Sequence, residues 1–573
     1  MTARTRQLSV LLTVLLGIGL AAVLVGCGSG GSSSGGGSPG PTSTTSTPAT
    51  STSLQLDADS AGSIEKINNI YNTSIVSNDP NAFKAEYEAG FIQGKLQKDQ
   101  IPAARDNNWD GNYLTDPKHS FPTQLPPPPS QLNQAQRVLQ SNWEFTLRYI
   151  RDTAKAEVQT NLRRLLYRLV GIYDGATKSD PQALPFDGQW YPQFSPAEMA
   201  VTYETPAPTF MDIYYLNNTG DLFNFLPPPT SGGSSSASAS PVSLHAPEAA
   251  SHCTAFIKRT VGDIFLSHNT WSAFLDQSQA TQLWVNGDFM SSNAIDPAYL
   301  GSGTDFGYTN KGLIWNETTE DATKGKGKVE SLWTSWRETL AEQYADSIDT
   351  FFKYISLEQS GSYMNGYMLV DTKQDKLGYV EMSTNTTVFF TLDAKGGVQV
   401  TTKPAGLDTA YDKKMVQPNY ILGFNYPASM LIRKQLAAIN NRPARQVQLL
   451  AGINGVNDVE SAKALITYTA PDNPLSIYGR WDLGYGETTT PQKVPDGSID
   501  AKVVSASMAQ QSFGLKGVLA PGAGQSAFWM KYGTASVAGK PFIWSQSPWS
   551  SQKLRYVPDV VDGTWTLLNT NIS

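Results

Sequence analysis

An interior segment that cannot pack divides this chain and limits what each side of it can fold into. Three prolines at 227–229 lead into residues 231–240, which are all Ser, Gly or Ala. A stretch of this composition has too little apolar surface to form a core. We therefore predict a disordered linker over 226–252, between a mostly helical segment at 54–225 and a β-rich segment at 253–573.

The N-terminus has the pattern of an export signal. Arg4 and Arg6 precede an apolar run over 8–25, and the run ends at Gly26-Cys27. This order is typical of a secretory signal peptide, here 1–26. The cysteine after Val-Gly resembles a bacterial lipobox, which implies that Cys27 carries a lipid and anchors an exported protein to the bacterial cell envelope. The alternative is a short membrane anchor, although a span needs ~20 apolar residues. Residues 27–53 form a Gly/Ser/Thr/Pro-rich flexible tether.

Composition argues against two classes of partner. The net charge is −7 and the chain has no long basic run, so nucleic acid is not expected as a partner. The two cysteines are far apart and the four histidines lack a His-x-x-x-His pattern, so we expect neither a metal site nor a cofactor.

Hydrophobic periodicity predicts the main elements. Helical spacing is found over 82–101, 131–176 and 329–357. A hairpin is expected over 254–265 with its turn near Gly262. Further strands are expected at 311–317, 367–371, 377–382, 388–392 and 398–402, the last four as antiparallel neighbours.

Cys253 stands where the linker meets the first strand. If Cys27 is lipidated, Cys253 has no disulfide partner in the chain. A thiol at this boundary suggests a chain that cleaves itself between His252 and Cys253, which would free the α-amine of Cys253. An α-amine with a pKa of ~7.7–8.0 is suited to take the proton of a thiol whose pKa is ~8.5. We therefore predict an N-terminal-nucleophile hydrolase.

His268 is the histidine best placed to act with this thiol. Paired strands would bring positions 253 and 268 to the same end of a sheet, although His268 could instead cap a turn. His252 precedes the scissile bond and would become a new C-terminus, so it has no catalytic role in this scheme.

Several motifs together resemble the phospholipase B-like (lamina-ancestor) family. Cys-Thr-Ala at 253–255 and Ser-His-Asn-Thr-Trp at 267–271 resemble the start of its mature domain. Further matches occur in the family's order at 87–94, 312–319, 360–368, 497–503 and 540–549.

The resemblance implies an α+β fold: an αββα sandwich of the N-terminal-nucleophile type, with the helical prodomain packed on it and retained after cleavage. It implies that Cys253 is the nucleophile and that His268 positions the thiol or the substrate. Asn365 would be an oxyanion or amine-orienting donor. Thr318, Trp271 and Asn269 would contact substrate, although Trp271 could equally be a core residue.

The sequence departs from the family pattern near this site. Some relatives have Asp at the position of Asn269, and Met364 and Gly366 also differ. The leading hypothesis is a hydrolase that cleaves an acyl amide or ester, in a phospholipid or an N-acyl compound, through a thioester. The alternative is a surface lipoprotein of the same fold that binds without turnover.

Overall fold

The computed structural model describes residues 50–114, 127–226, 253–303, 305–320, 327–435, 443–470, 476–479, 496–513, 527–535, 543–546, 550, 555, 557 and 563–569. The predicted signal peptide, Cys27, most of the tether, His252 and all of the predicted linker except Leu226 lie outside these residues.

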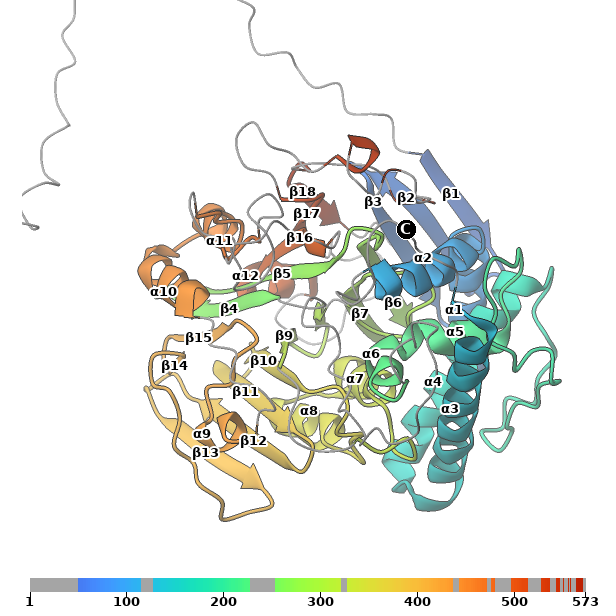
Figure 1. Ribbon diagram of the computed structural model, residues 1–573, viewed down its shortest axis with the longest axis horizontal. Helices are drawn as coiled ribbons and strands as arrows, with labels where there is room; N and C mark the ends of the chain where they lie inside the picture. The colour runs from blue at the N-terminus through green and yellow to red at the C-terminus, as the bar shows by residue number, and fades with distance from the viewer. Residues whose placement is uncertain are drawn as a thin grey trace, which may run out of the picture. The chain divides into compact units, whose positions relative to one another are not determined.

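Two β-sheets form the centre of the described structure (Figure 1). The first has 11 strands in the order β1-β2-β3-β6-β7-β8-β9-β10-β11-β12-β13. Their bounds are β1 Thr50–Gln55, β2 Ser60–Ile67, β3 Ile70–Ser77, β6 Gln279–Val285, β7 Asp288–Ala294, β8 Phe306–Thr309, β9 Leu313–Thr319, β10 Asn365–Asp371, β11 Lys376–Ser383, β12 Thr386–Leu392 and β13 Val398–Lys403.

The second sheet has seven strands in the order β14-β15-β4-β5-β16-β17-β18. Their bounds are β14 Val416–Gln417, β15 Tyr420–Gly423, β4 Thr254–Arg259, β5 Ile264–Ala273, β16 Asp496–Ser505, β17 Ala527–Tyr532 and β18 Thr566–Asn569. The expected hairpin at 254–265 is confirmed as the central pair β4–β5.

Helices cover the outer faces of both sheets. The 11-stranded sheet is covered by α1 Ala82–Gln97, α2 Ile101–Leu114, α3 Pro129–Arg148, α4 Ala156–Thr177, α5 Phe210–Asn217, α6 Thr219–Phe223, α7 Thr334–Tyr344 and α8 Ile348–Ile355. Near the second sheet lie α10 Pro443–Gly452, α11 Val459–Ile466 and α12 Ala506–Phe513, with α10 and α11 beside β4 and β5 in Figure 1. Helix α9 Met430–Arg433 lies beside β11 and β12 of the first sheet. Short turns occur at Tyr149–Thr153, Ile453–Gly455 and Trp544–Gln546.

One apolar core lies between the first sheet and its helices, and a second contains the facing side chains of the two sheets. Alternation along β10 separates these cores: Leu369 belongs to the helix side, whereas Met368 and Val370 belong to the side that faces the second sheet. The predicted α+β, αββα architecture is confirmed.

The N-terminal segment contributes strands as well as the expected helices. Residues 50–77 form β1, β2 and β3, and the first of these overlaps the end of the predicted tether at 27–53. Strand β3 pairs in parallel with β6, from Tyr71 opposite Gln279 to Ser77 opposite Val285. The first sheet therefore runs without interruption from the N-terminal segment into the segment that starts at Cys253.

Helices α1 and α4 pack so closely that only glycine fits at their contact. A Cβ atom on Gly90 or Gly94 would lie 2.1 or 2.0 Å from the carbonyl oxygen of Arg168 or Ile172. A Cβ on Gly171 or Gly175 would meet carbonyl oxygens of α1 at 2.2 and 2.0 Å. Small residues spaced four apart let two helix backbones approach each other in this way.

Candidate active site

Cys253 immediately precedes β4, at the N-terminal end of this central strand of the second sheet. Its side chain is 3 % exposed. Thr254 lies opposite Asn269 and Ala255 lies opposite His268 in the β4–β5 ladder. The register therefore brings Cys253 and His268 to one end of the hairpin, as predicted. His268 lies opposite Ala255, so it is about two residues further along the ladder than Cys253.

Two buried side chains fix the backbone on the C-terminal side of Cys253. Asn269 accepts a hydrogen bond from the Thr254 N–H at 2.9 Å and donates to the carbonyl oxygens of Ile466 and Ile477 at 2.9 and 2.8 Å. Asn269 thus ties β4 to the chain near α11. It was predicted to bind substrate, but its amide is occupied by backbone groups.

Arg445, in α10, is the second of these side chains, and the sequence did not point to it. Its guanidinium donates to the Cys253 carbonyl oxygen at 2.9 Å and to Asn425 Oδ1 at 3.1 Å. It also donates to the Phe424 carbonyl oxygen at 2.8 Å. Asn425 is buried in a left-handed conformation and donates to the Thr319 carbonyl oxygen at 2.6 Å. The contact between Arg445 and Cys253 joins residues 192 positions apart, which no local motif can indicate.

The ring of Trp271 packs beneath this arginine. The guanidinium carbon of Arg445 lies 5.1 Å from the ring centroid, and the indole N–H donates to the Ile477 carbonyl oxygen at 3.3 Å. The side chain is 1 % exposed. Trp271 was predicted to line an acyl pocket, and its contacts agree better with the alternative reading as a core residue.

The thiol of Cys253 is held in its neutral form in the intact chain. Burial raises its pKa to about 12, and the negative charge of Asp305 raises it as well. A backbone hydrogen bond from Trp271 and the positive charge of Lys502 act in the opposite direction. Ionisation of this thiol therefore requires an additional base or a change in its surroundings.

His268 faces the first sheet and is uncharged. Burial, and then the positive charge of Lys502, hold its pKa well below the ordinary value, while a backbone contact with Glu317 acts the other way. Lys502 donates to Asp500 Oδ1 and Thr270 Oγ1, both at 2.6 Å. A neutral imidazole can orient a donor or an acceptor but carries no fixed charge.

Thr318 and Asn365 occupy opposite faces of the first sheet. Thr318 pairs with Gly366 and points toward the second sheet, where its buried hydroxyl has no hydrogen-bond partner among the described residues. Asn365 points to the helix side, where its amide, in its best orientation, contacts Tyr367, Glu317 and the Met364 carbonyl. No contact in the described structure joins Asn365 to Cys253, so its oxyanion role stays a prediction.

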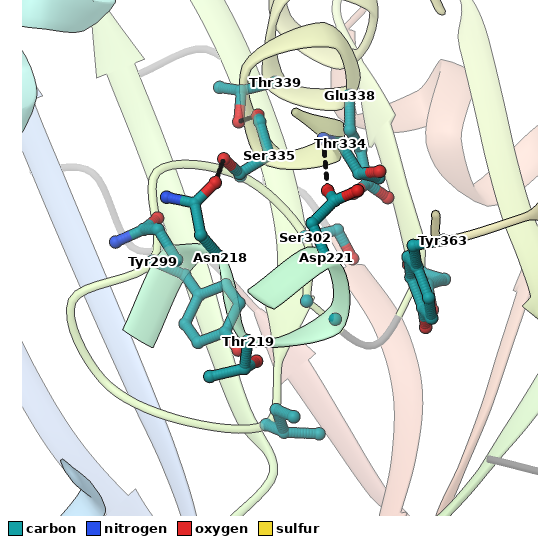
Figure 2. Close-up of a pocket in the computed structure, with 16 residues that line it drawn as sticks. Asn218, Thr219, Asp221, Tyr299, Ser302, Thr334, Ser335, Glu338, Thr339 and Tyr363 are labelled. Atoms are coloured by element: carbon teal, nitrogen blue, oxygen red, sulfur yellow. Dashed lines mark hydrogen bonds between the residues drawn. The ribbon is translucent and has the colours of Figure 1, made fainter. Parts of the chain in front are cut away.

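Figure 2 shows a pocket with about 570 Å³ of space, part of which is open solvent. It is lined by the end of α5 and the start of α6, by the loop at 299–305, by α7 and by Tyr363. Asp305 lines the pocket and also raises the pKa of Cys253. The pKa of Tyr363 is raised by burial and by electrostatic interaction with the acidic groups of Glu317, Asp305 and Cys253. Two lining residues, Asp305 and Tyr363, therefore interact electrostatically with Cys253, and the N-terminal segment supplies part of the pocket wall.

Two further properties concern only the described part of the chain. No group of three or more His, Cys, Asp or Glu side chains there is arranged to hold a metal ion. No helix among these residues has the length and apolar character that crossing a bilayer requires.

The chain is similar to known proteins over most of its length. A family model described as Phospholipase B matches residues 194–568. The chain is 22% identical to phospholipase B-like 1 of Homo sapiens over 496 residues. The aligned region covers 80% of this chain and 79% of that protein. It is 23% identical over 467 residues to phospholipase-B 81 of Drysdalia coronoides, covering 77% and 76%. It is 27% identical over 342 residues to phospholipase B of Crotalus adamanteus, covering 53% and 58%.

Proposed function

Because the chain belongs to the phospholipase B family and is a hydrolase, we propose that it hydrolyses an acyl ester or amide with Cys253 as nucleophile, after cleaving itself between His252 and Cys253. The observation that carries this proposal is the position of Cys253: a buried thiol at the start of β4 that interacts with Asp305 of the pocket, with its carbonyl oxygen held by Arg445.

Self-cleavage would begin at the carbonyl carbon of His252. The Cys253 sulfur attacks this carbon, the C–N bond breaks, and the nitrogen takes the proton that the thiol loses. The product is a thioester with a free α-amine on Cys253. Water then hydrolyses the thioester, which leaves a carboxylate on His252 and restores the thiol. Arg445 and Asn269 keep β4 in place, because they hold the Cys253 carbonyl and the Thr254 N–H.

Turnover would use the α-amine as base. The amine takes the thiol proton, and the thiolate attacks the acyl carbonyl carbon of the substrate. The tetrahedral oxyanion needs hydrogen-bond donors. The Thr318 hydroxyl and the second N–H of Asn425 are the donors we assign. Collapse breaks the bond to the leaving alcohol or amine, which takes the proton from the ammonium group. Water then hydrolyses the acyl thioester by the same route.

Self-cleavage is tested by intact mass and N-terminal sequencing of the purified full chain and of a Cys253→Ala variant. We expect a fragment that begins at Cys253 in the native protein and an uncut variant. A Cys27→Ser variant is the matched control, since it changes the chain's only other cysteine and should still be cut. A native chain that stays intact, with no acyl release from phospholipid or N-acyl substrates, would overturn the proposal.

That negative result would favour the alternative of a non-catalytic binding protein. One observation speaks for this alternative, since the Cys253 pKa is raised to about 12 in the intact chain. We also propose export with a lipid on Cys27. The mass of the N-terminal fragment tests this, because lipidation adds acyl chains at Cys27 and Cys27→Ser removes them.

A further inference from the structure

The pocket shown in Figure 2 has acidic and aromatic walls and no basic residue. Asp221, Asp305 and Glu338 are among the 16 described residues that line it, and none of these residues is Lys, Arg or His. The part-exposed residues Tyr299 and Tyr363 also line it, and most of the remaining lining residues are neutral and polar or glycine. Aromatic faces carry a partial negative charge, so carboxyl groups and rings together favour a positively charged guest.

The acidic groups of the pocket differ in how far the protein itself satisfies them. Asp221 is fully used by the protein: it accepts hydrogen bonds from the Thr334 N–H at 2.7 Å and from the hydroxyls of Ser360 and Ser362, both at 2.5 Å. Figure 2 shows the bond to Thr334.

Glu338, by contrast, is 6 % exposed, and its Oε1 atom has no donor among the described residues. Glu338 belongs to a cluster of three carboxyl groups with Asp305 and Glu317. Asp305 is 7 % exposed and lies within hydrogen-bonding reach of both Glu338 and Glu317. Two carboxyl groups can bond to each other only by sharing a proton, and Glu317 Oε2 also lacks a donor. Burial, and then Asp305, raise the pKa values of Glu338 and Glu317 well above the ordinary range, so these two carboxyl groups hold protons in the structure as described. A cation beside them would favour their ionised form and replace those protons as their partner.

We infer that this pocket binds an ammonium group of the substrate, next to the acyl bond that Cys253 attacks. The catalytic consequence rests on the proposed function, but the binding itself does not. The ammonium group has two possible sources: the head group of a choline or ethanolamine lipid, or the amine released from an N-acyl compound. Ammonium chemistry is common to both, and none of the pocket's lining residues would neutralise a phosphate.

Binding is measured by titration calorimetry on the full chain with choline, ethanolamine and inorganic phosphate as probes. We expect saturable binding of an ammonium probe that is weakened at least about tenfold in Glu338→Gln, because an amide cannot release a proton and become the negative partner of the ammonium group. Glu330→Gln is the matched control, since its side chain is 66% exposed before α7 and should not affect affinity. Tyr299→Leu provides a second variant, with an expected loss of about threefold or more.

Equal ammonium affinity in native protein, Glu338→Gln and Tyr299→Leu would overturn the inference, as would tighter binding of phosphate than of either ammonium ion. Hydrolysis then separates the sources. Preference for short-chain phosphatidylcholine or phosphatidylethanolamine over phosphatidylglycerol assigns the head group. Preference for an N-acyl diamine over the matching N-acyl alkylamine assigns the leaving amine. Preference for phosphatidylglycerol contradicts the inference. Ammonium binding without hydrolysis would sink the proposed function alone.

Discussion

Arg445 is the side chain on which the position of Cys253 most depends. Its fork holds the carbonyl oxygens of Cys253 and Phe424 and the amide oxygen of Asn425 at the same time. A lysine ammonium cannot reproduce this planar set of donors. We expect Arg445→Lys to slow both self-cleavage and acyl release by about 10²-fold, because small displacements of a reacting group cost that much.

The measurement is the time course of fragment appearance, together with single-turnover acyl release from protein that has already been cut. Arg433→Lys is the matched control, since this arginine pairs with Asp412 at 3.2 Å near β11 and β12 and touches no residue of the site. Normal rates in Arg445→Lys would show that the guanidinium does not position the cysteine.

Asn269 offers a stability test that separates its structural role from substrate binding. Its amide nitrogen donates to two carbonyl oxygens, at 2.9 and 2.8 Å. Asn269→Asp would place a buried carboxylate oxygen against both, with no donor to offer. We expect the free energy of unfolding to fall by about 3 kcal/mol, measured by urea titration. Asn457→Asp, at an exposed position, should be close to neutral. An unchanged stability with weaker substrate binding would restore the predicted contact role.

At the scale of elements, hydrophobic periodicity predicted the hairpin and strands that depend mainly on neighbouring residues. The β4–β5 hairpin and strands β10 to β13 were found where alternation placed them. The helix expected at 329–357 is instead two helices, because Ser347 caps α8 by accepting from the Thr350 N–H. The helix expected at 131–176 is interrupted at Tyr149–Thr153, after which Ala154 has extended backbone. Apolar periodicity continues across both breaks, so it could not reveal them.

The α1–α4 contact yields a prediction at the same scale. Gly94→Ala would place a methyl group 2.0 Å from the Ile172 carbonyl oxygen, and helix backbones cannot separate locally without losing the packing around them. We expect a loss of about 3 kcal/mol in the free energy of unfolding. Gly455→Ala is the control, since nothing lies within 4 Å of its added Cβ. Equal stability of the two variants would show that the helix pair is looser than described.

At the scale of the whole molecule, the candidate site is assembled from distant parts of the chain. The residues around Cys253 come from β4, from β5, from the segment before α9, and from α10. The pocket adds residues from α5, α6 and α7. The sequence identified Cys253 and His268 because one hairpin carries both. It could not identify Arg445, Asn425 or Asp305, because their relation to the cysteine depends on how two sheets stack.

The continuous first sheet predicts that self-cleavage does not separate the two segments. Strand β3 pairs with β6, and the helices of the N-terminal segment share a core with α7 and α8. We expect cut protein to elute as one species in size-exclusion chromatography and to dissociate only in denaturant. Two separate peaks from cut protein under native conditions would contradict the shared core.

The buried carboxyl groups predict that stability falls as the solution becomes more alkaline. Burial raises the pKa of Glu342 to about 8 and those of Glu381 and Asp276 to about 7. Because each folded-state pKa exceeds the unfolded value, the native state binds more protons above about pH 4.5. The contribution of each group to the free energy of unfolding is fully present below the group's pKa in the unfolded chain. This contribution is lost as the pH rises through the group's pKa in the folded protein. His268 opposes this trend only below about pH 6.5, where the unfolded chain takes up its proton.

We therefore expect urea midpoints to fall between pH 6.5 and 8. In this interval Glu342 alone contributes a slope of about 1.4 kcal/mol per pH unit to the free energy of unfolding. Glu342→Gln should flatten the profile by that amount, because an amide does not titrate, and it should keep the bond from the Ser302 N–H that Glu342 accepts at 2.9 Å. Glu330→Gln, with the same change of charge at an exposed position, should leave the slope intact. A native profile that rises across this interval would mean that these carboxyl groups are ionised in the folded protein, with cations held beside them.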